Sequence, residues 1–233
     1  MADSLTGLER EVTSCTRCPR LVEWRERSAA EPPRRYQGQS YWARPLPGFG
    51  DPRAAIVIVG LAPAAHGGNR TGRIFTGDRS GDWLYAALHR AGLANQPTSV
   101  SVDDGLRLRG AYVTAVNRCP PPQNRPTTEE RDNCLPYLVR ELRLLRCCRV
   151  IVALGSFAWT GSLLALAALG AEISRPRPRF AHGAEAMIEV SGGDRPEWSL
   201  LGCFHPSQQN TFTGKLTEPM MDAVFARARE LAG

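Results

Sequence analysis

Lysine is almost missing from this chain of 233 residues: Lys215 is the only lysine, although lysine and arginine together number 29. A Schiff-base reaction needs an amine nucleophile, so only Lys215 and the N-terminal amine are available for one. The formal net charge is nevertheless +6, which favours a polyanionic partner. Because richness in Arg, Ala, Gly and Pro is typical of a GC-rich genome, the arginine excess alone needs no functional explanation.

Long apolar segments and export features are also lacking. The longest apolar run, residues 163–169, is far shorter than the roughly 20 residues of a membrane-spanning helix. The N-terminus carries Asp3, Glu9 and Glu11 and no hydrophobic segment, so we expect no secretory signal. An odd count of seven cysteines speaks against a disulfide framework. We expect a single cytoplasmic domain (1–233), monomeric and with no membrane partner.

Four cysteines form two pairs, Cys15 with Cys18 near the start and Cys119 with Cys134 about a hundred residues later. Thiolates in this arrangement suit Zn²⁺ or an iron–sulfur cluster, and the spacing does not choose between them. Two unrelated buried thiol pairs are the simpler alternative. The other three cysteines are expected to be ordinary buried residues: Cys147, Cys148 and Cys203.

Strand-like and helix-like segments alternate along the chain, which predicts an α/β fold with a mainly parallel sheet. Ser80 is expected to cap one helix, and Pro136 to split the helix that begins at Thr127. The expected strands are 54–60, 111–116, 149–155, 186–190 and 198–204, and the expected helices are 5–12, 21–27, 82–91, 127 onward, 157–169 and 216–231.

Three polar motifs follow expected strands: residues 60–78, 117–119 and 205–210. In parallel sheets, ligands bind outside the carboxyl ends of the strands. The candidate site therefore lies at that edge. Because Cys119 belongs to the second motif, the cysteine centre is expected to border the same edge.

The loop Gly60–Asp78 (GLAPAAHGGNRTGRIFTGD) resembles the first motif of the family 5, or type B, uracil-DNA glycosylases, and His205–Gly214 (HPSQQNTFTG) resembles their second motif. The two cysteine pairs match the iron–sulfur ligands that families 4 and 5 share. This resemblance implies a three-layer α/β/α sandwich around a parallel four-stranded sheet, with a structural [4Fe–4S] cluster on an N-terminal arm. It also implies removal of uracil and other deaminated bases from DNA, near the nucleoid.

Excision of a base hidden in a duplex requires flipping the nucleotide into a pocket. The transition state needs negative charge or an oriented water near the sugar and donors near the base. Leu61 and Ala62 cannot activate water, so Asp78 is the candidate for the sugar side, with capping of the next helix as its alternative role. His205 is the candidate donor to the leaving base, unless it is a strand-end histidine satisfied by backbone.

Phe75 is the candidate stacking ring, or alternatively a core residue. Relatives usually carry an asparagine at the position of Ala115, and Asn117 is the amide nearest to it. The candidate substrate-binding set is Ala62, Pro63, Ala64, His66, Phe75 and Asn117. The candidate DNA-binding set is a polar wedge with two phosphate contacts: Gln208, Gln209, Asn210, Lys215 and Arg73, with Arg70 as an alternative to Arg73.

Three rival functions remain open. A family 4 enzyme would share the cysteines, but the acidic first motif expected of it is missing. A non-catalytic metal-containing DNA-binding protein is the second rival, and the third is a nucleotide-binding enzyme, although the loop lacks the G-x-x-x-x-G-K-[ST] pattern. Because Lys215 is better placed for a phosphate contact than for a Schiff base, we expect hydrolysis that leaves an intact strand with an abasic site.

Overall fold

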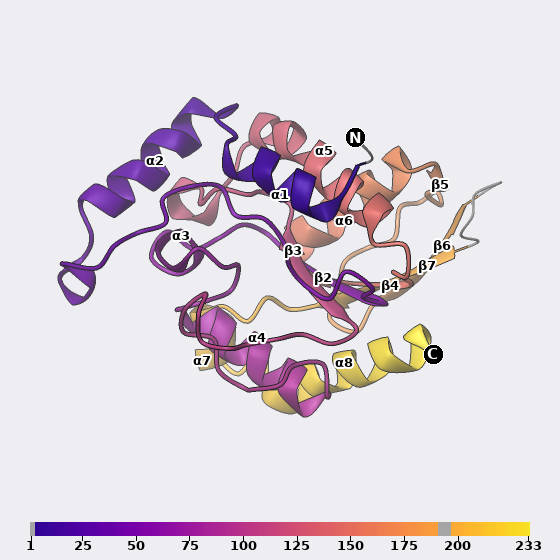
Figure 1. Cartoon of the computed structure of the whole chain (residues 1–233). Coiled ribbons are helices and arrows are strands. Elements are labelled where there is room, and N and C mark those ends of the chain that lie inside the picture. The colour runs from indigo at the N-terminus through magenta and orange to yellow at the C-terminus, as the bar shows by residue number, and fades with distance from the viewer. Residues whose placement is uncertain (1–2, 191–196) are drawn as a thin grey trace.

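The computed structural model describes residues 3–190 and 197–233, which form one mixed sheet in the order β1-β3-β2-β4-β7-β6-β5 (Figure 1). Its four central strands run parallel to one another, as predicted. β2, β3 and β4 are buried throughout, as continuous apolar runs in a parallel sheet should be. These four strands are β3 (Ala111–Ala115), β2 (Ile56–Gly60), β4 (Val150–Leu154) and β7 (Glu197–Cys203).

Antiparallel strands extend the sheet at both edges. β1 (Phe49–Gly50) pairs with β3, β6 (Glu185–Val190) pairs with β7, and β5 (Ala171–Glu172) pairs with β6. The sequence predicted β6, but β1 and β5 are two-residue strands with no periodicity to reveal them.

Helices cover both faces of the sheet and give it three layers (Figure 1). Alternate residues of β2 point to opposite faces. Val57 and Val59 pack under α5 and α6, whereas Ile56 and Ile58 pack under α4 and α8. One layer consists of α1 (Leu5–Thr13), α5 (Thr128–Leu144) and α6 (Ser156–Ala168), and the other of α4 (Arg79–Arg90) and α8 (Glu218–Ala232).

Shorter elements surround the carboxyl end of the sheet. α2 (Pro19–Ala30) projects at one end of the molecule (Figure 1). α3 (Gly68–Thr71) and α7 (Gln208–Phe212) are single-turn helices inside the two polar motifs, and 3₁₀ turns occupy 34–36 and 122–124. No helix within the described ranges is long and apolar enough to cross a membrane.

Three local predictions need correction. Asp78, not Ser80, caps α4, because its Oδ1 accepts a hydrogen bond from the Gly81 amide (3.1 Å). Pro136 does not split α5, since it lies on the exposed side of the helix, where the carbonyl it leaves unpaired can face water. Cys147 is exposed rather than buried. The predicted helix start at Thr127 is confirmed: Thr127 is the N-cap of α5 and forms a capping box with Glu130.

Candidate functional site

The two polar motifs meet at the carboxyl end of β2. The ring of Phe75 lies directly over Gly60, where a Cβ would come within 2.6 Å of the ring. The Phe75 and His205 ring centroids are 5.9 Å apart and the rings are tilted by 33°. Phe75 is 6 % exposed and adopts a left-handed φ of 51°. The structure thus brings together the predicted stacking residue and the predicted donor.

His205 follows β7 and lies next to the end of β4. A Cβ at Gly155, the glycine after β4, would lie 3.5 Å from the Cβ of His205. The side-chain amide of Asn210 donates to the backbone carbonyl of His205 (2.8 Å). Burial lowers the pKa of His205 to about 4, so its imidazole is neutral at pH 7. A neutral imidazole in this position can still donate one hydrogen bond.

Asp78 closes the first motif and is held in a tight turn. Burial raises the pKa of its carboxyl, while hydrogen bonds from the Gly81 and Ser80 amides oppose that rise. The carboxylate lies against Gly67, where any Cβ would collide with Asp78 Oδ2. Gly81 in turn packs on the Phe75 carbonyl. Asp78 is therefore both the helix cap and a half-buried carboxyl in the same turn as Phe75.

His66 contacts two tyrosines, Tyr36 and Tyr41, that were not among the predicted site residues. The Tyr41 hydroxyl is 3.0 Å from His66 Nδ1, and Tyr36 packs 6.1 Å from the imidazole centroid. Burial, followed by the charges of Arg35 and Arg70, lowers the pKa of His66. The segment 34–41 had only turn-forming signals in the sequence, so its contact with the motif was invisible there. Of the other predicted lining residues, Pro63 is buried, while Ala62 and Ala64 are half-buried.

Asn117 is fully buried, its Nδ2 donates to the backbone carbonyl of Glu130 (3.0 Å), and its backbone amide donates to the Leu61 carbonyl (3.0 Å). Its Oδ1 accepts no hydrogen bond from the described residues. The side chain thus joins the loop after β3 to α5, and its part in base binding stays a prediction. Ala115 pairs with Gly60 in the sheet register and is fully buried in the same apolar cluster as Phe75.

The second motif presents α7 at the edge of the site. Gln208 and Gln209 are exposed, as a groove contact requires, whereas Asn210 is partly occupied by its bond to His205. Phe212 is 68 % exposed, and the Arg79 guanidinium covers its ring at 4.2 Å. This apolar tip was missed because the wedge was predicted to be polar. Lys215 is exposed, with Nζ 4.9 Å from the ring centroid of Phe204.

Arg73 is unavailable to a phosphate, contrary to the sequence prediction. Only 5 % of the residue is exposed. Its guanidinium pairs with Asp104 (2.7 Å) and donates to Thr76 and Ser99. Arg73 therefore ties the first motif to the loop before β3. Arg70 is occupied too, since it donates to the carbonyls of His66 and Gly77.

The four predicted metal-binding cysteines gather at one side of this edge. Cys15 follows α1, Cys18 caps α2, Cys119 follows β3 and Cys134 lies in α5. Burial raises the pKa of the Cys119 and Cys134 thiols, while Arg25 opposes the rise at Cys119 and Arg118 opposes it at Cys134. Cys18 Sγ lies 3.6 Å from the side-chain amide of Asn133, the residue before Cys134 in α5.

Arg25 lies between the cysteines and the first motif. Its guanidinium donates to Cys119 Sγ (3.4 Å) and to the Cys15 carbonyl (3.3 Å). Its Nε is buried and has no acceptor among the described residues. The Arg25 carbonyl accepts a hydrogen bond from Asn69 Nδ2 (3.1 Å), and Asn69 belongs to α3 in the first motif. A buried donor without an acceptor beside the thiols fits a negatively charged group held there.

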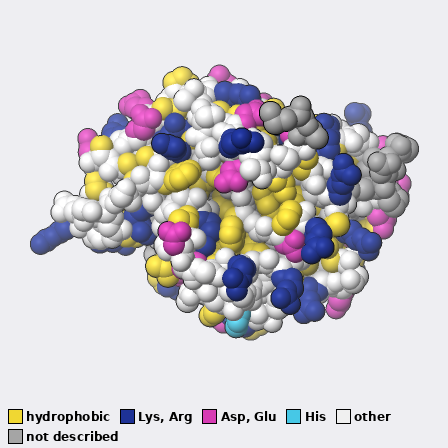
Figure 2. Space-filling model, viewed as in Figure 1, with side chains coloured by type: hydrophobic (Ala, Val, Ile, Leu, Met, Phe, Trp, Pro, Cys, Tyr) yellow, Lys and Arg dark blue, Asp and Glu magenta, His cyan; other side chains and the backbone are white. Residues whose placement is uncertain are grey.

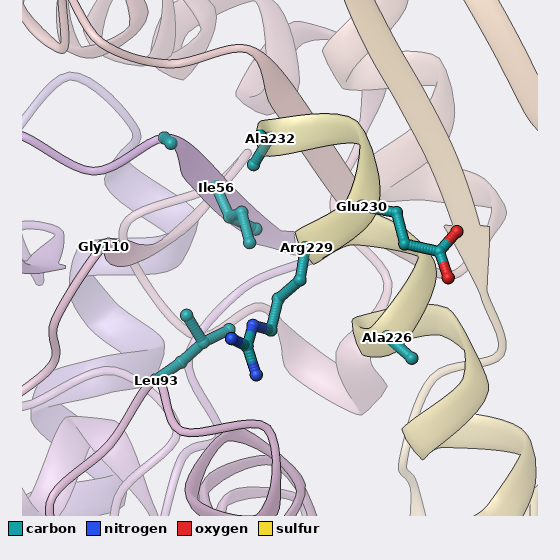
Figure 3. Close-up of a pocket in the computed structure, with 9 residues that line it drawn as sticks. Ile56, Leu93, Gly110, Ala226, Arg229, Glu230 and Ala232 are labelled. Carbon is teal, nitrogen blue, oxygen red and sulfur yellow. The ribbon is translucent and has the colours of Figure 1, made fainter.

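A hollow of about 460 Å³ lies at the opposite edge of the sheet, away from these residues. Figure 3 shows Ile56, the first residue of β2, beside Ala232 of α8, with Gly110, just before β3, to their left. Arg229 points toward Leu93 across the hollow (Figure 3). Because the amino ends of parallel strands face it, this hollow is separate from the candidate site.

The sequence model of the Uracil DNA glycosylase superfamily matches residues 47–229, and the chain belongs to this superfamily. The matched range contains both polar motifs and the Cys119/Cys134 pair.

Relatives refine the placement within the superfamily. The chain is 53 % identical over all its 233 residues to the type-5 uracil-DNA glycosylase of Mycobacterium bovis, covering 83 % of that protein. It is 49 % identical to the type-5 enzyme of Thermus thermophilus, with 95 % of each chain covered. The type-4 enzyme of Archaeoglobus fulgidus is 34 % identical over 67 % of this chain and 62 % of its own. These figures confirm the resemblance to family 5 that the motifs indicated.

Proposed function

We propose that this chain is a monofunctional DNA glycosylase, which flips uracil and other deaminated bases out of DNA and hydrolyses the N-glycosidic bond. The observation that carries the proposal is the contact between Phe75 and His205 over Gly60, with Asp78 in the adjoining turn. The type-5 names of the similar proteins support the same activity.

Phe75, His205 and Asp78 each have a separate role in the proposed reaction. Phe75 offers a ring face for stacking the flipped base. His205, neutral because burial lowers its pKa to about 4, donates to a base oxygen as negative charge develops there. Asp78 carries the charge that stabilises the sugar side and orients water. Ala115 is fully buried at the position where relatives usually carry an asparagine, and the base range is measured by comparing excision of uracil, hypoxanthine and xanthine from matched duplexes.

We propose a structural [4Fe–4S] cluster on Cys15, Cys18, Cys119 and Cys134. Within the described ranges, no three His, Cys, Asp or Glu side chains are close enough to share a single metal ion. The proposal rests instead on the two cysteine pairs and on the buried Arg25 guanidinium, which donates to Cys119 Sγ. When bound, it supplies metal–thiolate bonds between the arm and α5, and Arg25 balances part of its negative charge.

The chain is further proposed to act as a single-domain cytoplasmic monomer associated with the nucleoid. Gel filtration with light scattering tests the oligomeric state. A family 4 assignment is disfavoured by the lower identity and shorter coverage of the type-4 relative.

The decisive experiment incubates the protein with uracil-containing duplex and then cleaves abasic sites with alkali. We expect cleavage only after alkali, because the reaction is hydrolytic. Asp78→Asn and His205→Ala should each slow single-turnover excision by about 10²–10³, whereas His89→Ala, an exposed histidine of α4, should not. Full activity in both site variants would refute the assignment, and no excision by the unaltered protein would leave the non-catalytic DNA-binding alternative.

A further inference from the structure

The segment between β5 and β6 carries three arginines alternating with prolines: Arg175, Arg177 and Arg179. All three are exposed, and none forms an ion pair with a carboxylate of the described residues. Glu185, which follows the segment, is instead paired with Arg227 of α8 (2.9 Å). The segment therefore displays unneutralised positive charge.

A hydrogen bond and aromatic packing hold this segment against α6 and the residue that follows β7. Trp159 Nε1 in α6 donates to the Pro178 carbonyl (2.9 Å). The Phe180 ring packs 6.1 Å from Trp159 and 6.2 Å from Phe204, centroid to centroid. Proline also restricts its own backbone and that of the residue before it. The arginines thus extend from a backbone whose position is set before any ligand binds.

The C-terminal end of the segment reaches the carboxyl end of β7. The Gly183 amide donates to the Gly202 carbonyl (2.8 Å), and a Cβ at Gly202 would collide with the Ala181 carbonyl. His182 Nδ1 accepts a hydrogen bond from the backbone amide of Phe204 (3.1 Å). Since Phe204 directly precedes His205, the arginine segment adjoins the candidate site.

Charge alone does not single out this surface. Figure 2 shows Lys and Arg side chains spread over the face that it views, with hydrophobic side chains between them. What distinguishes residues 175–179 is an anchored backbone, three unpaired charges and continuity with His205. Lys215, whose Nζ lies 4.9 Å from the ring centroid of Phe204, adds a further positive charge near the segment.

We propose that Arg175, Arg177 and Arg179 bind the phosphate backbone of the DNA duplex that flanks the flipped nucleotide. This surface rests on the proposed glycosylase function and specifies how the enzyme holds its substrate. Each arginine neutralises one phosphate and releases its counterions, so the contact gives affinity without base preference.

The test measures how salt weakens binding to an undamaged fluorescent duplex, because this reading does not depend on excision. Each phosphate contact contributes about 0.9 to the slope of log K against log salt concentration. The variant Arg175→Gln/Arg177→Gln/Arg179→Gln loses three such contacts, so its slope should be shallower by roughly 2–3. The matched control, Arg53→Gln/Arg107→Gln/Arg109→Gln, removes the same charge from exposed positions before β2 and β3 at the opposite edge. It should keep the original slope.

Equal slopes for the two triple variants, with folding confirmed by thermal unfolding, would overturn the proposal. Excision of uracil by the unaltered protein is measured in parallel. If excision is absent but the slopes differ as expected, the glycosylase function falls while the DNA surface stands. If excision is present and the slopes are equal, only the surface assignment falls.

Discussion

The N-terminal arm (residues 3–44) and the sheet body (residues 45–190 and 197–233) are each stabilised by different forces. In the arm, α1 contributes a small apolar cluster of Leu8 and Val12 against Tyr137 of α5. The body contains two large clusters, one on each face of the sheet, built from fully buried aliphatic and aromatic side chains. Because burial of apolar area is the main source of folding free energy, the body can be stable where the arm cannot.

Polar contacts also join the arm to the body. Arg20 pairs with Glu130 (2.7 Å), whose side chain is buried, and Arg140 pairs with Asp3 and Glu11, whose side chains are exposed. Ion pairs open to solvent contribute little to stability. We therefore expect the arm to depend on the proposed cluster for its position, and the sheet to be independent of it.

The largest expected effect comes from removing one cluster ligand. Cys119→Ser should abolish most of the visible absorbance of the purified protein and release the arm, because metal binding is coupled to folding of the ligand-bearing segments. Limited proteolysis should then cut within residues 3–44 and leave the body intact. Cys147→Ser is the control, since Cys147 is exposed and outside the cysteine centre. Stoichiometric zinc without iron in the unaltered protein would instead rule out the cluster.

A smaller effect is expected on the stability of the body when the pH is lowered, because His205 belongs to the body. The folded pKa of His205 is lowered to about 4 by burial, below its ordinary 6.5, so the unfolded chain binds the proton more readily. The body should therefore lose stability as pH falls from about 6.5 to about 4, by at most about 3 kcal/mol. Denaturant unfolding of the unaltered protein and His205→Gln measures the difference. A loss of equal size in both would assign the acid sensitivity to other groups.

The parts of the structure that the sequence could predict are those set by local apolar patterns. The central strands were predicted within a residue or two, because continuous apolar runs bounded by glycine or polar residues leave few alternatives. Phe75, Asp78 and His205 could be singled out because each lies in a motif that follows a strand. The pairing of Arg73 with Asp104 joins residues 31 apart in sequence, and local pattern carries no trace of it.

Other parts of the site were hidden for the same physical reason. Tyr36 and Tyr41 come to His66 from a stretch with turn signals alone, and Asn117 turns toward α5 because a carbonyl there accepts its amide. Gly155 was predicted as the end of a strand, but its place beside His205 depends on the β4–β7 pairing. Such contacts arise from tertiary packing, so no window of sequence contains them.

The smallest expected effect lies at the junction of the two regions. Asn69 Nδ2 donates to the carbonyls of Arg25 (3.1 Å) and Ala65 (3.3 Å), so one buried side chain joins α2 to the first motif. Asn69→Leu removes both bonds, each worth about 0.5–1.5 kcal/mol. The substitution also removes the buried Oδ1 of Asn69, which accepts no hydrogen bond from the described residues. Removing this unsatisfied acceptor offsets part of the loss.

We therefore expect a net destabilisation of roughly 1 kcal/mol, concentrated at this junction. Hydrogen exchange should show lower protection in α2 and α3 while the central strands keep theirs. Asn95→Leu is the control, because Asn95 is exposed and bonds only within residues 95–107, at the opposite edge of the sheet. Uniform loss of protection across the sheet in Asn69→Leu would mean that the arm and the body unfold as one unit. Loss confined to α2 and α3 would instead show that the Asn69 side chain holds α2 against the first motif.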